Sequence, residues 1–237
     1  MRIQKRLALA CKVKIKDQIA RNVLNAYLGQ SAGSRVLGGQ IKRGDGERIY
    51  AVIWYCDLRN STKMAEAMPM GDFLGILNVY FECTAGAVLN RGGEVLLLIG
   101  DAVLAIFPIG PGVATEAEAC EAALLAARDA EERLAHANRR RMDTGFSPLA
   151  FGLGLHVGTV TYGNIGVPER LQFTVVGAAV NEVARLEALT KMLDRRALVS
   201  AEFASKLSVA WEPLGQYELR GLADPREVFA PPPAGHV

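Results

Sequence analysis

Two carboxylates interrupt strongly apolar stretches of the sequence and are the first residues that suggest chemistry. Asp57 lies within AVIWYCDLRNST (51–62), and Asp101 lies within EVLLLIGDAVLAIF (94–107). An acid in apolar sequence is costly unless it is exposed, paired or bound to a metal ion, and oxygen ligands suit hard divalent cations. Two such ions can drive in-line phosphoryl chemistry. Structural alternatives remain open: Gly100-Asp101 fits a two-residue hairpin turn, and Asp57 could help to start the following helix.

A second group of polar residues stands in the block RLQFTVVGAAVNEVARLEAL (170–189). Asn181 and Arg185 are one helical turn apart, so both project from the same helix face. An amide and a guanidinium in that arrangement could bind a ribose and a phosphate, although the pair also fits an ordinary polar helix face. The segment after the first aspartate offers a further phosphate site, because it leads into a helix whose free N–H groups favour anions. Ser61 and Thr62 in that segment also fit a simple capping role.

The elements that must position these residues predict an α+β domain. We expect strands over 49–56, 94–99, 102–107, 149–161 and 170–176, and helices over 61–90 with a break near Pro69, 115–141 and 178–191. Thr115-x-x-Glu118 predicts a capping box at the start of the second helix. The order βαββαβ predicts a ferredoxin-like fold with helices packed on one face of the sheet. No P-loop sequence occurs, and Gly152-x-Gly154 lacks the third glycine of a dinucleotide fingerprint.

The N-terminal part of the chain differs in character from this domain. Residues 1–30 place apolar residues at roughly helical spacing among basic ones, which predicts an amphipathic helix. Such a helix could pack on a partner helix, continue from an upstream domain or contact an anionic membrane. Residues 31–47 are expected to be a glycine-rich connector, 48–230 the main domain, and 231–237 a proline-rich tail.

Composition limits the possible functions. A chain of 237 residues with 50% hydrophobic content can bury a substantial core, and a net charge of +2 does not favour nucleic-acid binding. The four cysteines have neither CxxC spacing nor nearby histidines, which fits the reducing cytoplasm. No run of 18 apolar residues and no signal-peptide core occurs, so we expect a soluble chain, for which membrane contact by the N-terminal helix is the minority alternative. His156 lies on an apolar strand and is expected to be structural.

In order and spacing, five segments resemble the catalytic domain of class III adenylate and guanylate cyclases across roughly residues 28–230. They are CDLRNST, GGEVLLLIGDAVLAIF, HVGTVTYGNIG, FTVVGAAVNEVARLE and LGQYELRGLADPREVF. The resemblance implies that Asp57 and Asp101 bind two divalent cations, Mg²⁺ or Mn²⁺, with the Leu58 carbonyl as an extra ligand. One ion would activate the ribose 3′-hydroxyl, and the other would steady the departing pyrophosphate.

The same resemblance implies the remaining roles and the assembly. Asn181 would orient the ribose, Arg185 would neutralise charge developing on the α-phosphate, and Arg220 in ELRG would bind the terminal phosphates. The candidate phosphate-binding residues after the first metal ligand are Arg59, Asn60, Ser61 and Thr62. In the family each pocket lies across a head-to-tail dimer interface, which implies a homodimer with two shared sites. An upstream regulatory domain remains open as a further partner.

The base pocket departs from the family pattern. Adenylate cyclases usually have lysine four residues before the second metal aspartate, where this chain has Leu97. Thr174 stands where many have aspartate, and it can accept a hydrogen bond from the adenine amino group. Loss of the lysine should weaken base discrimination by roughly 10- to 100-fold. We therefore expect a slow or loosely selective adenylate cyclase that makes cyclic AMP from ATP, with a guanylate cyclase or a non-catalytic nucleotide-binding regulator as alternatives.

Overall fold

The computed structural model describes residues 2–40, 42–222 and 224–232, with side chains described from Cys11 onward. The chain forms two compact units. The smaller unit comprises Met1–Gly46 and Gly163–Thr174, and the larger unit comprises Glu47–Tyr162 and Val175–Val237. Most of the sheet and most of the candidate site residues belong to the larger unit, which therefore carries the functional argument.

One sheet of eight strands organises the fold, in the order β2-β3-β1-β4-β6-β8-β7, with β5 paired to β4 outside this path. β3 pairs antiparallel with both β1 and β2, whereas β4 and β6 are parallel. The order β2-β3-β1-β4 belongs to the βαββαβ unit, so the prediction of a ferredoxin-like α+β fold is confirmed. The strands are β1 (Gly46–Leu58), β2 (Glu94–Ile99), β3 (Ala102–Ile109), β4 (Phe151–Val167), β5 (Arg170–Val176), β6 (Ala197–Ser200), β7 (Glu212–Tyr217) and β8 (Arg226–Ala230).

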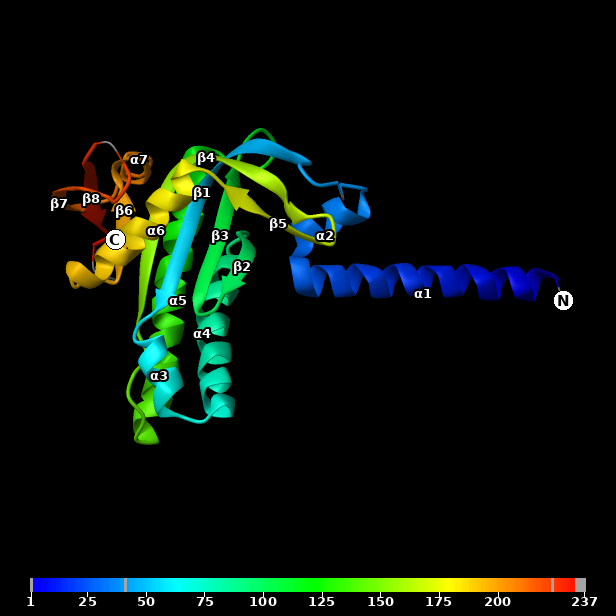
Figure 1. Ribbon diagram of the computed structural model, residues 1–237, viewed down its shortest axis with the longest axis horizontal. Helices are drawn as coiled ribbons and strands as arrows, with labels where there is room; N and C mark the ends of the chain where they lie inside the picture. The colour runs from blue at the N-terminus through cyan, green and yellow to red at the C-terminus, as the bar shows by residue number, and fades with distance from the viewer. Residues whose placement is uncertain (1, 41, 223, 233–237) are drawn as a thin grey trace. The chain divides into compact units, whose positions relative to one another are not determined.

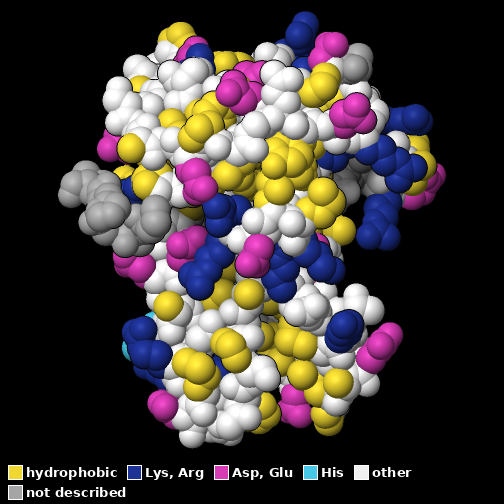
Figure 2. Space-filling view, turned by 90° about the vertical axis from the view of Figure 1, so that its left-hand side faces the viewer, with side chains coloured by type: hydrophobic (Ala, Val, Ile, Leu, Met, Phe, Trp, Pro, Cys, Tyr) yellow, Lys and Arg dark blue, Asp and Glu magenta, His cyan; other side chains and the backbone are white. Residues whose placement is uncertain are grey.

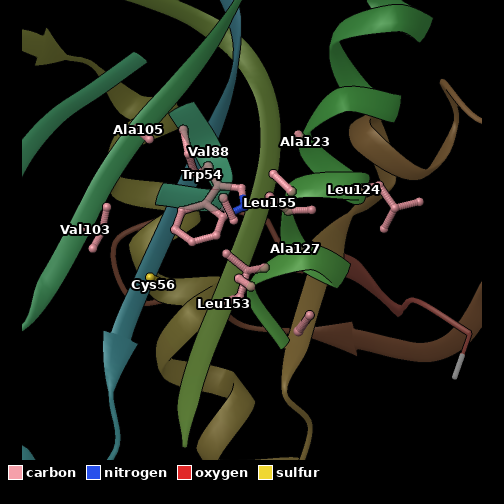
Figure 3. Close-up of a cluster of buried hydrophobic side chains, with 14 of the residues drawn as sticks. Trp54, Cys56, Val88, Val103, Ala105, Ala123, Leu124, Ala127, Leu153 and Leu155 are labelled. Atoms are coloured by element: carbon pink, nitrogen blue, oxygen red, sulfur yellow. The ribbon is translucent and has the colours of Figure 1, made fainter. Parts of the chain in front are cut away.

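Helices α4 (Met70–Asn90) and α5 (Glu116–Asp143) run side by side along one face of this sheet (Figure 1). Trp54 of β1 and Leu153 of β4 point into the core between sheet and helices (Figure 3). Alanines such as Ala123 line the inner side of α5 and let that helix pack close to the sheet. Because side chains alternate along a strand, every second residue of β1 and β4 faces this core.

Helix α6 (Ala178–Met192) packs on the opposite face of the sheet. Gly152 and Gly154 of β4 lie against it, and a Cβ atom at Gly154 would collide with the Val183 carbonyl oxygen. These glycines alternate with Leu153, so they point away from the core under α5. The helices of the βαββαβ unit therefore pack on one face as expected, and α6, which follows that unit in the chain, covers the other face. Two glycines in β4 remove the side chains that would keep the α6 backbone away from the sheet.

Several boundaries of helices and strands lie where the sequence predicts them. β2 and β5 have the predicted bounds, and Pro69 separates α3 (Ser61–Ala67) from α4 as expected. The predicted capping box opens α5: the Thr115 hydroxyl accepts a hydrogen bond from the Glu118 N–H, and the Glu118 carboxylate accepts one from the Thr115 N–H. The remaining helix, α7 (Ala201–Ala204), is a single turn after β6. Local capping and turn chemistry therefore decided these boundaries.

In the smaller unit, α1 (Arg2–Leu28) covers the segment that the sequence predicts to be helical. Leu24 and Leu28 are half-buried, but apolar side chains such as Val13 and Ile19 are exposed, so the packing partner expected for this helix stays a prediction. The segment expected to be a connector instead contains α2 (Gln30–Leu37). This helix forms because Ala32 is buried and Gly33 lets the backbone of α2 approach α1 closely.

Helix α4 is long and apolar enough to cross a membrane by length and composition, and it is the one such helix in the described part of the chain. Its residues Ile76, Tyr80 and Val88 are buried against the sheet and α5. Leu74 and Leu89 of the same helix are exposed, so α4 packs against the domain on one side only.

The surface carries charges of both signs. Figure 2 shows lysine and arginine side chains interspersed with acidic and apolar ones on one face of the molecule. That face has no single basic stripe of the kind that follows a nucleic-acid backbone. The cysteines are free thiols: Cys11 is exposed, and Cys56, Cys83 and Cys120 are buried.

Candidate functional site

The pairing of β1 with β3 brings Asp57 and Asp101 together. Asp57 lies opposite Ala102 in the antiparallel register, and Asp101 immediately precedes Ala102 in the turn between β2 and β3. Gly100 has a φ of 63°, a left-handed conformation that glycine adopts without strain in a tight turn. The structural reading of Gly100-Asp101 as a hairpin turn is therefore correct, and the same turn puts the second carboxylate beside the first.

Asp57 has the electrostatic character of a cation-binding carboxylate. Its Oδ1 atom is buried and has no hydrogen-bond partner among the described residues. Burial, followed by the hydrogen bond and charge of Asp101, raises the pKa of Asp57 to about 7, while a hydrogen bond from the Leu58 backbone lowers it. A divalent cation would satisfy the unpaired oxygen and offset the repulsion between the carboxylates. Two carboxylates and a backbone carbonyl are oxygen ligands that fit Mg²⁺ or Mn²⁺.

The turn that follows β1 is fixed by the backbone. The Arg59 N–H donates to the Ala150 carbonyl at 2.8 Å, and Asn60 adopts a left-handed φ of 60° before α3 begins. Asn60 is the N-cap residue, so the alternative that Ser61 or Thr62 caps this helix is wrong. The phosphate-binding roles of Asn60, Ser61 and Thr62 stay predictions.

The Arg59 side chain turns toward α6. Its Nη1 atom lies 3.5 Å from Glu187 Oε1, and its Nη2 donates a hydrogen bond to the Thr190 hydroxyl. The side chains of Arg59 and Glu187 are 21% and 7% exposed, so this ion pair is largely buried. A Cβ atom at Gly152 would collide with all three side chains. Gly152 therefore makes the space that they occupy.

Glu187 is a buried acid that reasoning from the sequence missed. Burial raises its pKa, Arg59 and then the Thr190 hydroxyl lower it, and the charge of Asp101 raises it further. Glu187 thus lies within electrostatic reach of the paired aspartates. The sequence held a signal only for the packing: glycine in a strand marks a close backbone approach, so Gly152 predicts a helix packed against β4 but does not identify Glu187.

Asn181 and Arg185 lie on successive turns of α6, as their spacing predicts. Asn181 is exposed and Arg185 is half-buried. The Arg185 guanidinium reaches the turn at Gly221, where a Cβ atom would lie 3.3 Å from its Nη2. Arg220 is the exposed residue just before that turn. The structure therefore brings Arg185 to the loop that carries Arg220, and the two cations can serve one anionic ligand.

The two residues expected to contact the base belong to different compact units. Leu97 is half-buried at a bulge in β2, where Val95 pairs with Ala105 and Leu97 pairs with Leu104. A bulge changes the direction of the side chain next to it. Thr174 on β5 is buried, and its Oγ1 has no hydrogen-bond partner among the described residues. Its unpaired hydroxyl is therefore a candidate for a hydrogen bond with a ligand.

His156 lies in a buried polar cluster, in agreement with the expected structural role. Its Nδ1 atom is 2.8 Å from the Ser200 hydroxyl oxygen, with Glu182 and Glu202 carboxylates 4.0 and 3.8 Å away. Burial lowers the pKa of His156, although both acids raise it. The potential ligand atoms of His156, Glu182 and Glu202 lie within 4.8 Å of one another, as metal ligands would. However, Arg226 Nε is 3.3 Å from Glu182, and this fixed cation would repel a metal ion.

Comparisons with known proteins agree with this geometry. The family described as "Adenylate and Guanylate cyclase catalytic domain" matches residues 48–230. The adenylate cyclase of Anabaena cylindrica is 31% identical over 195 residues, which cover 82% of this chain and 38% of the relative. The chain thus spans well under half of the length of that protein.

Solved structures share the fold. A bacterial light-regulated adenylyl cyclase matches with a TM-score of 0.76 at 24% identity, over 98% of this chain and 65% of that chain. The guanylyl cyclase Cya2 matches with a TM-score of 0.66 at 26% identity, over 78% of this chain and 92% of that chain. Because both an adenylyl and a guanylyl cyclase share this fold, the fold does not determine the base.

Proposed function

Because the chain belongs to the adenylate and guanylate cyclase catalytic domain family, we propose that it is an adenylate cyclase that converts ATP to 3′,5′-cyclic AMP and pyrophosphate. The observation that carries the proposal is the pairing of Asp57 with Asp101 at the end of β1. Asn181 and Arg185 also stand at the positions that match the family. A regulator that had lost catalysis would be expected to lack at least one of these four residues.

The proposed metal site consists of the Asp57 and Asp101 carboxylates and the Leu58 carbonyl, which would hold two Mg²⁺ or Mn²⁺ ions. When bound, the ions supply Lewis-acid activation of the 3′-hydroxyl and offset the charge of the leaving pyrophosphate. The unpaired, buried Oδ1 of Asp57 supports this role. The protein's own contribution is to hold both carboxylates in register at the hairpin, so that the site needs little reorganisation.

The other half of the proposed site binds sugar and phosphates. The Asn181 amide would orient the ribose for in-line attack, and Arg185 would stabilise negative charge that develops on the α-phosphate. Arg220 would bind the terminal phosphates, together with backbone groups of residues 60–62. The closeness of Arg185 to the loop of Arg220 supports binding of one triphosphate by both guanidinium groups.

We propose a homodimer in which one protomer supplies Asp57 and Asp101 and its partner supplies Asn181, Arg185 and Arg220. Two-fold symmetry would then create two equivalent sites. Leu98 and Ile99, next to the metal-binding turn, are 52% and 55% exposed. Apolar side chains exposed beside an active site suit a protein interface, and this supports a partner protomer at this edge.

For the base, the unpaired and buried hydroxyl of Thr174 supports adenine, because it can accept a hydrogen bond from the amino group. Leu97 offers the purine no hydrogen bond, and this residue favours the second candidate, a guanylate or loosely selective cyclase. The choice of adenine therefore rests on Thr174 alone.

The experiment that tests the proposal measures products. The purified chain is incubated with ATP, GTP, CTP or UTP and with Mn²⁺ or Mg²⁺, and cyclic nucleotides are identified by mass. We expect cyclic AMP with ATP and a smaller yield of cyclic GMP with GTP. Nucleotide binding without any cyclic product would favour the regulator, and a larger yield from GTP would favour the guanylate cyclase.

A further inference from the structure

The Arg59–Glu187 bridge, formed by Arg59, Glu187 and Thr190, joins two parts of the proposed machinery within one protomer. Arg59 follows the metal-ligand segment of β1 by one residue. Glu187 and Thr190 lie on α6, the helix that carries Asn181 and Arg185. The bridge therefore connects the metal-binding end of β1 directly to the helix that contacts ribose and phosphate.

Within the shared-site dimer, these two parts serve different active sites. The metal-binding residues of a protomer act in one site, and α6 of the same protomer acts in the other. We propose that the Arg59–Glu187 bridge couples the two active sites of the dimer, by tying the metal loop of one site to the α6 helix of the other. The inference rests on the proposed function, and it makes Arg59 a positioning residue rather than a phosphate ligand.

The burial of the bridge supports a positioning role. Glu187 is 7% exposed and Thr190 is 1% exposed. Water therefore cannot replace their contacts with Arg59 unless α6 moves. Removing one partner of a buried ion pair leaves the other charge uncompensated. Without Arg59, the Glu187 carboxylate would remain buried within the electrostatic reach of Asp101. α6 would then be expected to shift so that Glu187 reaches water.

Gly152 gives an independent way to disturb the same bridge. It contributes no charge and no hydrogen-bonding side chain, but it makes the space for Arg59, Glu187 and Thr190. A methyl group at this position would push the bridge apart without changing any group that a substrate could touch. Gly152→Ala therefore separates a role in positioning from a role in phosphate binding.

The test uses a heterodimer in which one of the two catalytic sites is intact, called the live site, and the other is inactivated, called the dead site. One chain carries Asp57→Asn and supplies only its α6 to the live site, while the other carries Asn181→Ala and supplies only its metal ligands. The two chains bear different tags, so that the heterodimer is purified. Arg59→Gln is then introduced into the Asp57→Asn chain, where Arg59 adjoins the dead site. If Arg59 acted only in the site that it adjoins, Arg59→Gln in this chain would not change the activity of the live site.

We expect Arg59→Gln in the Asp57→Asn chain to lower kcat of the live site by about tenfold, as small displacements of positioned groups do. The Mn²⁺ concentration for half-maximal activity should not change, because the live site's metal ligands are on the other chain. Gly152→Ala in the same chain should act in the same direction, and Arg59→Lys should restore part of the activity. The double variant Arg59→Gln/Glu187→Gln should be no worse than either single variant.

The control variant is Arg195→Gln in the same chain, which removes the exposed Arg195–Glu212 ion pair and should leave kcat unchanged. An unchanged kcat with both Arg59→Gln and Gly152→Ala, in heterodimers of normal thermal stability, would overturn the coupling and leave the proposed function intact. An inactive heterodimer before Arg59 is changed would instead overturn the shared-site arrangement, and the inference with it.

Discussion

The proposed metal-binding end of the domain and its proposed base-contacting positions follow the family pattern to different degrees. Asp57 and Asp101 are fixed by strand register and by a tight turn at Gly100, so the backbone itself determines their pairing. Leu97 and Thr174 are single side chains, and Leu97 stands where the resemblance to adenylate cyclases implies a lysine. Under the proposed function, this difference teaches that the reaction depends on charges held by the backbone, whereas selectivity depends on replaceable side-chain contacts.

The largest effect is expected at the metal end. Asp57→Asn or Asp101→Asn should lower cyclic nucleotide formation by about 10²–10³-fold, the scale seen when one preorganised charge-stabilising group is removed. The chain should stay folded, because asparagine has nearly the same shape. The measurement is kcat with saturating Mn²⁺, together with the melting temperature of each variant.

The matched control for this substitution is Asp143→Asn, which changes an exposed carboxylate at the end of α5. It should have the activity of the wild type. Activity close to wild type in a folded Asp57→Asn variant would remove the metal assignment, and with it the contrast between the two regions.

A smaller effect is expected at the base pocket. Leu97→Lys would offer adenine N1 a donor, whereas guanine N1 carries a proton and would meet a second donor. The ratio of kcat/KM for ATP to that for GTP should rise by about tenfold, as expected for one polar contact in a desolvated pocket. The same ratio is measured for Met142→Lys, which adds the same charge at an exposed position near the end of α5.

Lysine must fit a site shaped for leucine, so thermal stability is measured alongside the ratio. An unchanged ratio in a well-folded Leu97→Lys variant would remove Leu97 from the base pocket. A change of equal size in Met142→Lys would mean that a general increase in positive charge, rather than a base contact, alters selectivity.

The smallest effect concerns stability and pH. The folded-state pKa of Asp57 is raised from 3.8 to about 7, first by burial and then by Asp101. The folded chain therefore binds this proton more tightly than the unfolded chain, and that stabilisation is lost as pH rises from about 4 through 7. In EDTA, the melting temperature of the wild type should fall more between pH 5.5 and 8.5 than that of Asp57→Asn.

Because Asp57 is only half-buried, solvent screening reduces the difference to roughly 1 kcal/mol, or about 2–4 °C for a chain of this size. Addition of Mn²⁺ should remove the loss at high pH, since the cation favours the ionised carboxylates. If the melting temperatures of the wild type and Asp57→Asn fell equally between pH 5.5 and 8.5 in EDTA, the electrostatic account of the aspartate pair would be contradicted.

The sequence predicted the parts of this molecule that depend on local chemistry. The capping box at Thr115, the helix break at Pro69 and the hairpin at Gly100 are each encoded by adjacent residues, and the structure contains all three. The two-sided covering of the sheet was missed, because it depends on Gly152 and Gly154 meeting a helix that follows much later in the chain. Contacts between distant segments leave no periodic signal.

The same distinction applies to the candidate site. Asp57 and Asp101 could be found because each carboxylate interrupts an apolar run. Glu187 could not, because a glutamate on a helix usually faces water, and only the three-dimensional contact with Arg59 makes it a buried partner. Arg59 was assigned to phosphates for a similar reason: its position after the metal ligand was visible, but the direction of its side chain was not.

The measurement that tests the central claim most directly is complementation between two inactive chains. An Asp57→Asn chain and an Asn181→Ala chain are mixed after each homodimer is found inactive, and subunit exchange is verified. Random pairing should restore up to about a quarter of the wild-type sites, because half of the dimers are mixed and each contains one intact site. Cyclic AMP formation near that level is the result that we expect. A mixture that exchanges subunits and remains inactive would contradict the shared catalytic site.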